Sequence, residues 1–158
     1  MEKDTEQLDT AALRELAAAC TCMHIRKTAR MITQFYDMFL QPSGLRMTQF
    51  IVLVVAALSE QETVMQLAEK LAMDRSALAH TLKSLQEQGL LTIEQGPDRR
   101  TRLVWLTRQG TEAITRTLPC WRQAQEQLIA LLGERQSRVL LADLKRVEEL
   151  GTSIELLA

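Results

Sequence analysis

The stretch LAEKLAMDRSALAHTLKSLQEQGLLTIEQGPDRRTRLVWLT, which runs from Leu67 to Thr107, decides the fold of this chain. Its apolar spacing predicts a short helix, a turn over residues 72–74 and a second helix over 75–88. Residues 90–94 and 102–106 are rich in strand formers and are joined by a turn-rich segment, which predicts a hairpin. This order of elements predicts a helix-turn-helix followed by a β-wing.

The helix expected over 75–88 has two different faces. At 100° per residue its leucines fall on one stripe, which predicts that this stripe packs on the core. The opposite stripe carries small, polar or basic side chains and is expected to face outward, as it would also do in an ordinary surface helix. Asp74 can cap its first free N–H groups. The inward side chains are Leu78, Leu82 and Leu85, and the outward ones are Ser76, His80, Lys83 and Glu87.

The composition is that of a globular, mainly helical protein. The chain has 158 residues, 46% of them hydrophobic and 25% charged, with only 6 Gly and 3 Pro, which argues against a loop-rich all-β fold. The net charge is −1, but between Pro97 and Arg108 four Arg stand against one Asp, a local +3. A random solvated cluster would show the same excess of positive charge. The excess indicates DNA binding only because it lies at the expected wing.

Amphipathic helices are expected on both sides of the winged unit. An apolar segment over 49–59, which Thr48 would cap, should lie in the middle of the domain, and a polar turn over 60–63 should follow it. Pro119 should bend or divide the helix that contains it. The further helices are expected over 9–40 (about 30 residues, unusually long), 64–71, 107–132 and 134–157.

The outer helices all have apolar faces that the winged unit does not need. We therefore expect a homodimer, because a two-fold dimer presents two DNA readers at the spacing of a symmetric target. The expected organisation is an N-terminal dimerisation helix (1–43), a winged helix-turn-helix DNA-binding domain (44–108) and C-terminal dimerisation helices (109–158). The N-terminus has no apolar signal segment and the apolar run 50–58 is too short to span a bilayer, so a cytoplasmic location without membrane contact is expected.

Three segments resemble the multiple-antibiotic-resistance regulator (MarR) family of winged-helix transcription factors. They are GLRMTQFIVL (44–53), QLAEKLAMDRSALAHTLKSLQEQGLLT (66–92) and GPDRRTRLVWLTRQG (96–110). The resemblance implies a homodimer that binds a pseudo-palindromic duplex DNA operator, usually as a repressor. It also implies that the helix over 75–88 enters the major groove and that Arg100 enters the minor groove, with Asp98 orienting Arg100 across the wing tip.

The DNA-binding residues expected on this basis lie on the second helix and the wing. The helix departs from the family pattern at Ala77, Ala79 and His80, since relatives often place Thr or Ser and then Arg nearby. Fewer charged base contacts and more reliance on the wing are therefore expected, although alanine can touch a thymine methyl. The candidates are Arg75, Ser76, Ala79, His80, Lys83, Arg99, Arg100 and Arg102.

The three cysteines, Cys20, Cys22 and Cys120, leave several readings open. An odd number without an export signal does not indicate a disulfide framework. On a regular helix Cys20 and Cys22 lie 200° apart and should not bond each other. The cysteines are either small apolar residues in helix packing, or a sensor of oxidants or of a thiophilic metal or metalloid, or incidental to an organic-ligand pocket.

No cofactor is required and no metal site is assigned from the sequence. The family binds small-molecule effectors between the dimerisation helices and the winged domain, which implies lining by Arg26, Arg30, Tyr36 and Trp121, unless these are solvated or core residues. An enzyme is not expected, since a phosphate loop, HExxH and GxSxG are all missing from the sequence. A winged-helix protein–protein interaction module remains the alternative, and steep salt dependence of DNA affinity would separate the two.

Overall fold

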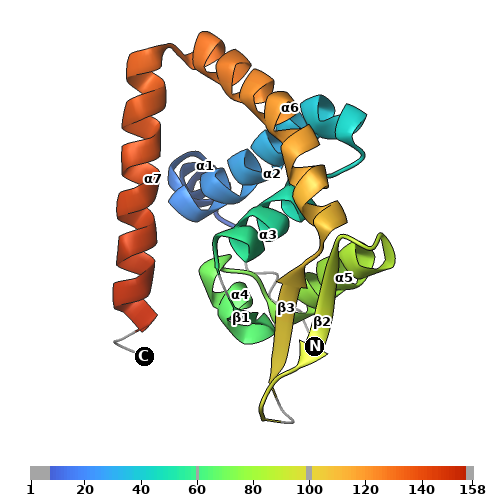
Figure 1. Ribbon diagram of the computed structural model, residues 1–158. Helices are drawn as coiled ribbons and strands as arrows, with labels where there is room; N and C mark the ends of the chain where they lie inside the picture. Colours follow the sequence, from blue (N-terminus) through green and yellow to red (C-terminus); the bar gives the residue numbers. More distant parts are fainter. Residues whose placement is uncertain (1–7, 60, 99–100, 156–158) are drawn as a thin grey trace, which may run out of the picture. The chain divides into compact units, whose positions relative to one another are not determined.

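The computed structural model describes residues 8–59, 61–98 and 101–155 (Figure 1). The chain divides into two compact units, Met1–Phe35 and Tyr36–Ala158. The described chain is mainly helical with one small antiparallel sheet, which confirms the expected fold class. No single described helix is long and apolar enough to span a membrane. Thr21–Ser43 and Met47–Leu58 reach that length and composition only together, across a bend of 77°.

The first unit contains a helix break that the sequence did not predict. In place of one helix over 9–40, α1 (Thr10–Ala19) and α2 (Thr21–Leu40) are separated by Cys20, which is extended with φ −69° and ψ 103°. The backbone remains tied across the break, because the N–H of Cys20 donates to the Leu16 carbonyl at 2.9 Å. The His24 ring nitrogen Nε2 lies 3.1 Å from the Ala18 carbonyl, one of the acceptors that the end of α1 leaves without a helical donor. The expectation of one continuous helix is wrong.

The second unit is built around α3 (Met47–Leu58), which contacts α4, α5, α6 and β3. The chain reaches it through the 3₁₀ turn η1 (Gln41–Ser43) and Gly44. Thr48 does not cap α3, because the helix starts earlier, with Arg46 at the cap position. The first free N–H, that of Met47, donates instead to the Asp37 carboxylate near the end of α2, at 2.6 Å. The central position expected for the apolar segment is confirmed.

The winged unit contains one strand more than expected. It comprises β1 (Glu62–Thr63), α4 (Val64–Lys70), α5 (Arg75–Glu87), β2 (Leu91–Gln95) and β3 (Arg102–Leu106). The sheet order is β1-β3-β2, with Leu91 opposite Leu106 and Gln95 opposite Arg102. The segment expected as a polar turn over 60–63 thus contributes β1, which pairs with β3 through Glu62 and Val104; Glu60 itself lies outside the described residues.

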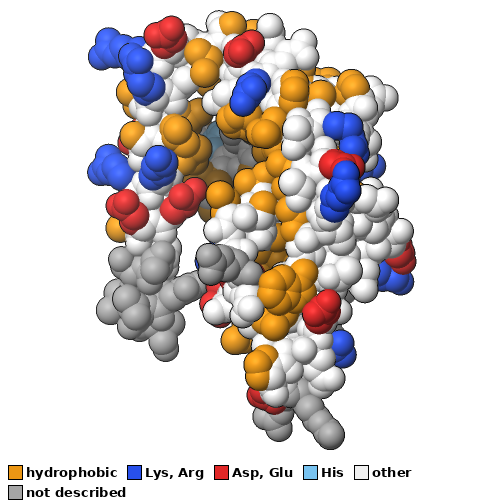
Figure 2. Space-filling model, in the orientation of Figure 1, with side chains coloured by type: hydrophobic (Ala, Val, Ile, Leu, Met, Phe, Trp, Pro, Cys, Tyr) orange, Lys and Arg blue, Asp and Glu red, His pale blue; other side chains and the backbone are white. Residues whose placement is uncertain are grey.

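Two long helices close the chain: α6 (Arg108–Leu132) and α7 (Glu134–Glu155). Thr107 caps α6 by accepting from the N–H of Gly110 at 3.0 Å. Pro119 does not divide α6, which continues through it. Gly133, with φ +83°, separates the two helices. Figure 2 shows both charged and hydrophobic side chains along α7.

Candidate nucleic-acid interface

The described part of the interface is centred on α5, which is anchored along one face. Leu78, Leu82 and Leu85 are at most 1% exposed and belong to the main hydrophobic core. Complete burial of each such side chain stabilises the folded protein by about 1.5–3 kcal/mol. The predicted division of this helix into an inward and an outward face is therefore confirmed.

The turn before α5 has an unusual backbone. Ala72 adopts φ +47°, the left-handed region that non-glycine residues rarely occupy. The N–H groups of Ala72 and Met73 donate to the carbonyls of Glu69 and Ala68, at 3.1 and 3.0 Å. These bonds close the end of α4 and redirect the chain into α5, so the angle between the two helices depends on a left-handed residue that is not glycine.

The outward face of α5 is exposed in the second unit. The predicted contact residues on this helix are all exposed: Arg75, Ser76, Ala79, His80 and Lys83. Lys83 Nζ lies 3.9 Å from Glu87 Oε1, and with both side chains largely exposed this pair contributes little to stability. The pair does lower the net positive charge of the face.

Asp74 organises the first turn of α5. Its Oδ1 accepts from the N–H of Ala77 at 2.9 Å, as predicted for the cap, and also from the Ser76 hydroxyl at 2.6 Å. The bond from Ser76 and then that from Ala77 lower the pKa of Asp74. The carboxylate is therefore ionised at neutral pH and its orientation is fixed by the helix that it caps.

The wing carries its described charges near the tip. Arg102 is exposed at the start of β3, and Asp98 is exposed in the turn between β2 and β3. The N–H of Thr101 donates to the Asp98 carbonyl at 2.9 Å, and that of Gly96 donates to the Thr101 carbonyl at 2.9 Å. Arg99 and Arg100 lie outside the described residues, so the orientation of Arg100 by Asp98 stays a prediction.

A tight joint connects α5, the wing and α6. Gly89 has φ +70°, and its carbonyl accepts from the Thr107 hydroxyl at 2.7 Å. The N–H of Thr107 donates to the Leu90 carbonyl at 3.2 Å. A Cβ on Gly110 would lie 2.1 Å from that same carbonyl oxygen, so only glycine fits there. Sequence reasoning assigned Thr107 to a helix start but missed the role of Gly110 in this joint.

The residues expected around an effector divide between the two units. Arg26 and Arg30 are exposed in the first unit. In the second unit Tyr36 is buried, its hydroxyl donates to Gln125 on α6, and burial raises its pKa. Trp121, one turn before Gln125 on α6, packs partly buried against the core. Tyr36 and Trp121 are thus associated with the same stretch of α6.

The cysteines are also divided between the units. Cys22 is exposed and Cys20 half-buried in the first unit, while Cys120 is half-buried against the core of the second. Because Cys20 is extended, the argument that a regular helix holds Cys20 and Cys22 200° apart is wrong. Among the described ranges, no group of three or more His, Cys, Asp or Glu could hold a metal ion.

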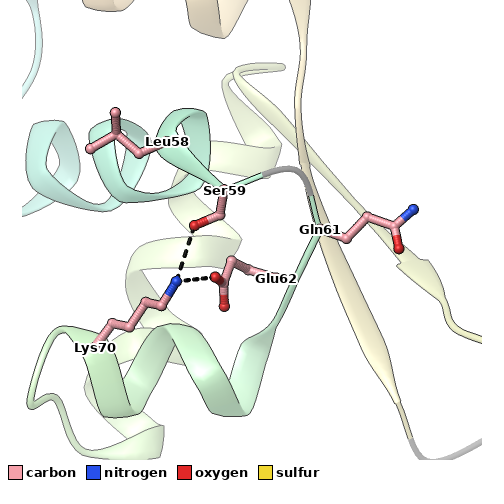
Figure 3. Close-up of a pocket in the computed structure, with 5 residues that line it drawn as sticks. All are labelled: Leu58, Ser59, Gln61, Glu62 and Lys70. Atoms are coloured by element: carbon pink, nitrogen blue, oxygen red, sulfur yellow. Dashed lines mark hydrogen bonds and ion pairs between the residues drawn. The ribbon is translucent and has the colours of Figure 1, made fainter.

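A separate open hollow of about 570 Å³ lies where α3 leads into β1 (Figure 3). It is lined by Leu58, Ser59, Gln61, Glu62 and Lys70. Lys70 binds the Glu62 carboxylate and donates to the Ser59 hydroxyl at 3.2 Å. The bond from Lys70 is the largest cause of the lowered pKa of Glu62, whose side chain is 8% exposed. The ion pair joins β1 to α4, and none of the sequence-predicted site residues lies in this hollow.

Comparisons with known proteins agree on one family. The model of the MarR family matches residues 43–101. An uncharacterised helix-turn-helix transcriptional regulator of Bacillus cereus is 28% identical over 124 residues, which cover 78% of this chain and 83% of that protein.

Solved structures extend the match over most of the chain. The M. tuberculosis transcriptional regulator MosR, crystallised with DNA, is 34% identical, with a TM-score of 0.71 and coverage of 83% of this chain and 97% of that one. A mutant of E. coli MarR crystallised with operator DNA shares the fold at 22% identity, with a TM-score of 0.74 and coverage of 84% and 96%. On this evidence the chain belongs to the MarR family of winged-helix transcription regulators.

Proposed function

We propose that this protein binds duplex DNA at a pseudo-palindromic operator and represses transcription, with α5 in the major groove and the β2–β3 wing against the adjacent backbone and minor groove. The exposed face of α5 carries the proposal, because Arg75, Ser76, His80 and Lys83 project from a helix whose opposite side is locked into the core. Repression is the usual activity implied by the family. The structures of MosR with DNA and of a MarR mutant with operator DNA support DNA binding by a protein of this fold.

Salt dependence of binding tests this proposal directly. Fluorescence anisotropy with duplexes selected from a random library should give affinities that fall steeply with salt, because phosphate contacts release counterions. Arg75→Ala and Arg102→Ala should each weaken binding, and a variant that loses a phosphate contact should lower the salt slope by about one. Arg122→Ala on α6, also exposed, serves as the matched control. Salt-independent or undetectable binding would contradict the proposal and favour a protein–protein interaction module.

The protein is further proposed to act as a homodimer through segments 1–43 and 109–158, leaving 44–108 as the DNA-binding domain. Apolar side chains on α7 support this, since they are 42–61% exposed in the single chain, which is unusual for six large apolar residues on one helix. A second copy is the partner that a symmetric DNA target requires. The six are Val139, Leu140, Leu141, Leu144, Val147 and Leu150.

Light scattering after gel filtration tests the dimer. Leu144→Glu should shift the protein to monomer and weaken operator binding, because a charge would be buried in the interface. Gln136→Glu adds the same charge near the start of α7 and is the control. A monomeric parent protein, or a Leu144→Glu variant that remains dimeric, would contradict the role of α7.

Control of DNA binding by an effector or by cysteine chemistry is proposed to act through these outer helices. The extended backbone at Cys20, two residues from the exposed Cys22, places two thiols at a helix break in the first unit. Treatment with peroxide, diamide or a thiophilic metal should lower operator affinity, and Cys20→Ser, Cys22→Ser and Cys120→Ser should show which thiol is responsible. Unchanged operator binding after all three treatments would contradict control by the cysteines. Control by a non-thiol effector, bound near Tyr36 and Trp121, would then remain.

A further inference from the structure

The first turn of α5 presents a hydroxyl whose only proton is already used. Resting on the proposed entry of α5 into the major groove, we infer that Ser76 acts as an acceptor-only reader of a base amino group, the N6 amine of adenine or the N4 amine of cytosine. Nothing in the family resemblance assigns this chemistry to Ser76; it follows from the bond that Ser76 makes to Asp74.

The direction of that bond is unambiguous. Ser76 Oγ lies 2.6 Å from Asp74 Oδ1. An ionised carboxylate has acceptors only, so the serine must donate, and a hydroxyl has one proton to give. The carboxylate is held in place because the same Oδ1 accepts from the N–H of Ala77 at 2.9 Å. Ser76 Oγ therefore keeps two acceptor lone pairs and no donor toward solvent.

The surface of DNA offers few partners to such an oxygen. Phosphate oxygens, guanine N7 and O6, adenine N7 and thymine O4 are all acceptors, and the neighbouring carboxylate adds repulsion to phosphate. The donors in the major groove are the amines of adenine and cytosine. Ser76 can consequently distinguish adenine or cytosine from guanine or thymine on a given strand, at one base position in each half-site.

Several neighbours of Ser76 on the helix are not suited to this role. Ala77 and Ala79 have no side-chain hydrogen-bonding group, and Arg75 has donors only, which suit a phosphate or a guanine edge. The Thr81 hydroxyl donates to the Ala77 carbonyl at 3.0 Å and is half-buried. Ser76 is exposed, so its lone pairs are accessible to a base edge.

Selection of duplexes from a random library by the parent protein and by Ser76→Ala tests the inference. The exposed helical site tolerates alanine, so the variant should fold. One symmetric pair of positions should require adenine or cytosine on one strand with the parent protein and lose that requirement with Ser76→Ala. In the selected duplex that base is then replaced by its analogue without the amine, a purine or 2-pyrimidinone deoxyriboside.

Removal of the amine should weaken binding of the parent about three- to tenfold, the value of one hydrogen bond. Ser76→Ala should bind the two duplexes equally, and Ser76→Thr, which keeps the hydroxyl, should retain the difference. Identical selections for parent and Ser76→Ala, or a sequence-independent loss with a lower salt slope, would overturn the inference while leaving DNA binding intact. Absence of any salt-dependent binding by the parent would instead overturn the proposed function, and this inference with it.

Discussion

Replacement of Gly110 by alanine should destabilise the joint between the wing and α6. The new Cβ would lie 2.1 Å from the Leu90 carbonyl oxygen and 2.7 Å from Leu106 Cδ1. A carbon and a carbonyl oxygen normally approach to about 3.3 Å, so the first turn of α6 and the start of β2 must separate by roughly 1 Å.

The cost can be estimated from the contacts that must change. Overpacking of this kind costs about 1–3 kcal/mol, and the bond from the Thr107 N–H to the Leu90 carbonyl contributes about 1 kcal/mol more. Less the roughly 1 kcal/mol by which a helix favours alanine over glycine, the net cost is about 1–3 kcal/mol, which corresponds to a fall in Tm of roughly 2–12 °C for a chain of this size. Because Leu90 precedes β2, the same displacement should reposition the wing and lower DNA affinity.

Urea and thermal denaturation at one fixed protein concentration measure this effect, since the proposed dimerisation would make stability depend on concentration. Gly151→Ala is the matched control, because a Cβ at that position on α7 meets no atom within 4 Å. The control should be neutral or more stable by up to about 1 kcal/mol, because alanine favours helix. A Gly110→Ala protein as stable as the parent would refute the close-approach argument.

Three further perturbations test other parts of the winged unit. Ala72→Gly should stabilise the protein by about 1 kcal/mol in urea denaturation, because glycine accepts φ +47° without strain; a loss of stability would contradict this. Asp74→Ala should lower stability at neutral pH, and the difference from the parent should become smaller as the pH falls through the lowered pKa of Asp74, because the ionised carboxylate accepts the bonds from Ser76 and Ala77 more strongly than the protonated one; a difference that does not change with pH would show that the carboxylate does not titrate as inferred. Glu87→Gln should raise affinity for DNA about threefold at low salt, because it removes the ion-pair partner of Lys83 and the repulsion between Glu87 and a DNA phosphate. At a separation of about 7 Å in water that repulsion is roughly 0.6 kcal/mol. Glu126→Gln on α6 is the control.

Local sequence patterns predicted α5 and its surroundings well. The leucine spacing, the Asp74 cap and the glycine after the helix depend on residues within a few positions of one another, and the structure places each as expected. The outward position of Arg75, Ser76, Ala79, His80 and Lys83 follows from the same periodicity. Their contacts with DNA remain predictions, as do those of Arg99 and Arg100, which lie outside the described residues.

Features that depend on distant partners were missed. β1 exists because Glu62 and Thr63 pair with β3, about 40 positions later, and two residues have no periodicity of their own. The N–H at the start of α3 is satisfied by Asp37, ten residues earlier, while Thr48 only resembled a cap. The break at Cys20 was hidden by an uninterrupted apolar pattern that continues on both sides of it.

The sequence by itself determined the winged helix-turn-helix and the two faces of its second helix, because helix periodicity, caps and turn residues act over one or two turns of chain. Only the tertiary structure decided how tightly the wing is joined to α6 at Gly110, and which proton the Ser76 hydroxyl has left to offer. Both depend on distances between particular atoms. A Cβ at Gly110 would lie 2.1 Å from the Leu90 carbonyl oxygen, and the Ser76 hydroxyl lies 2.6 Å from the Asp74 carboxylate. Residue spacing alone does not specify such distances.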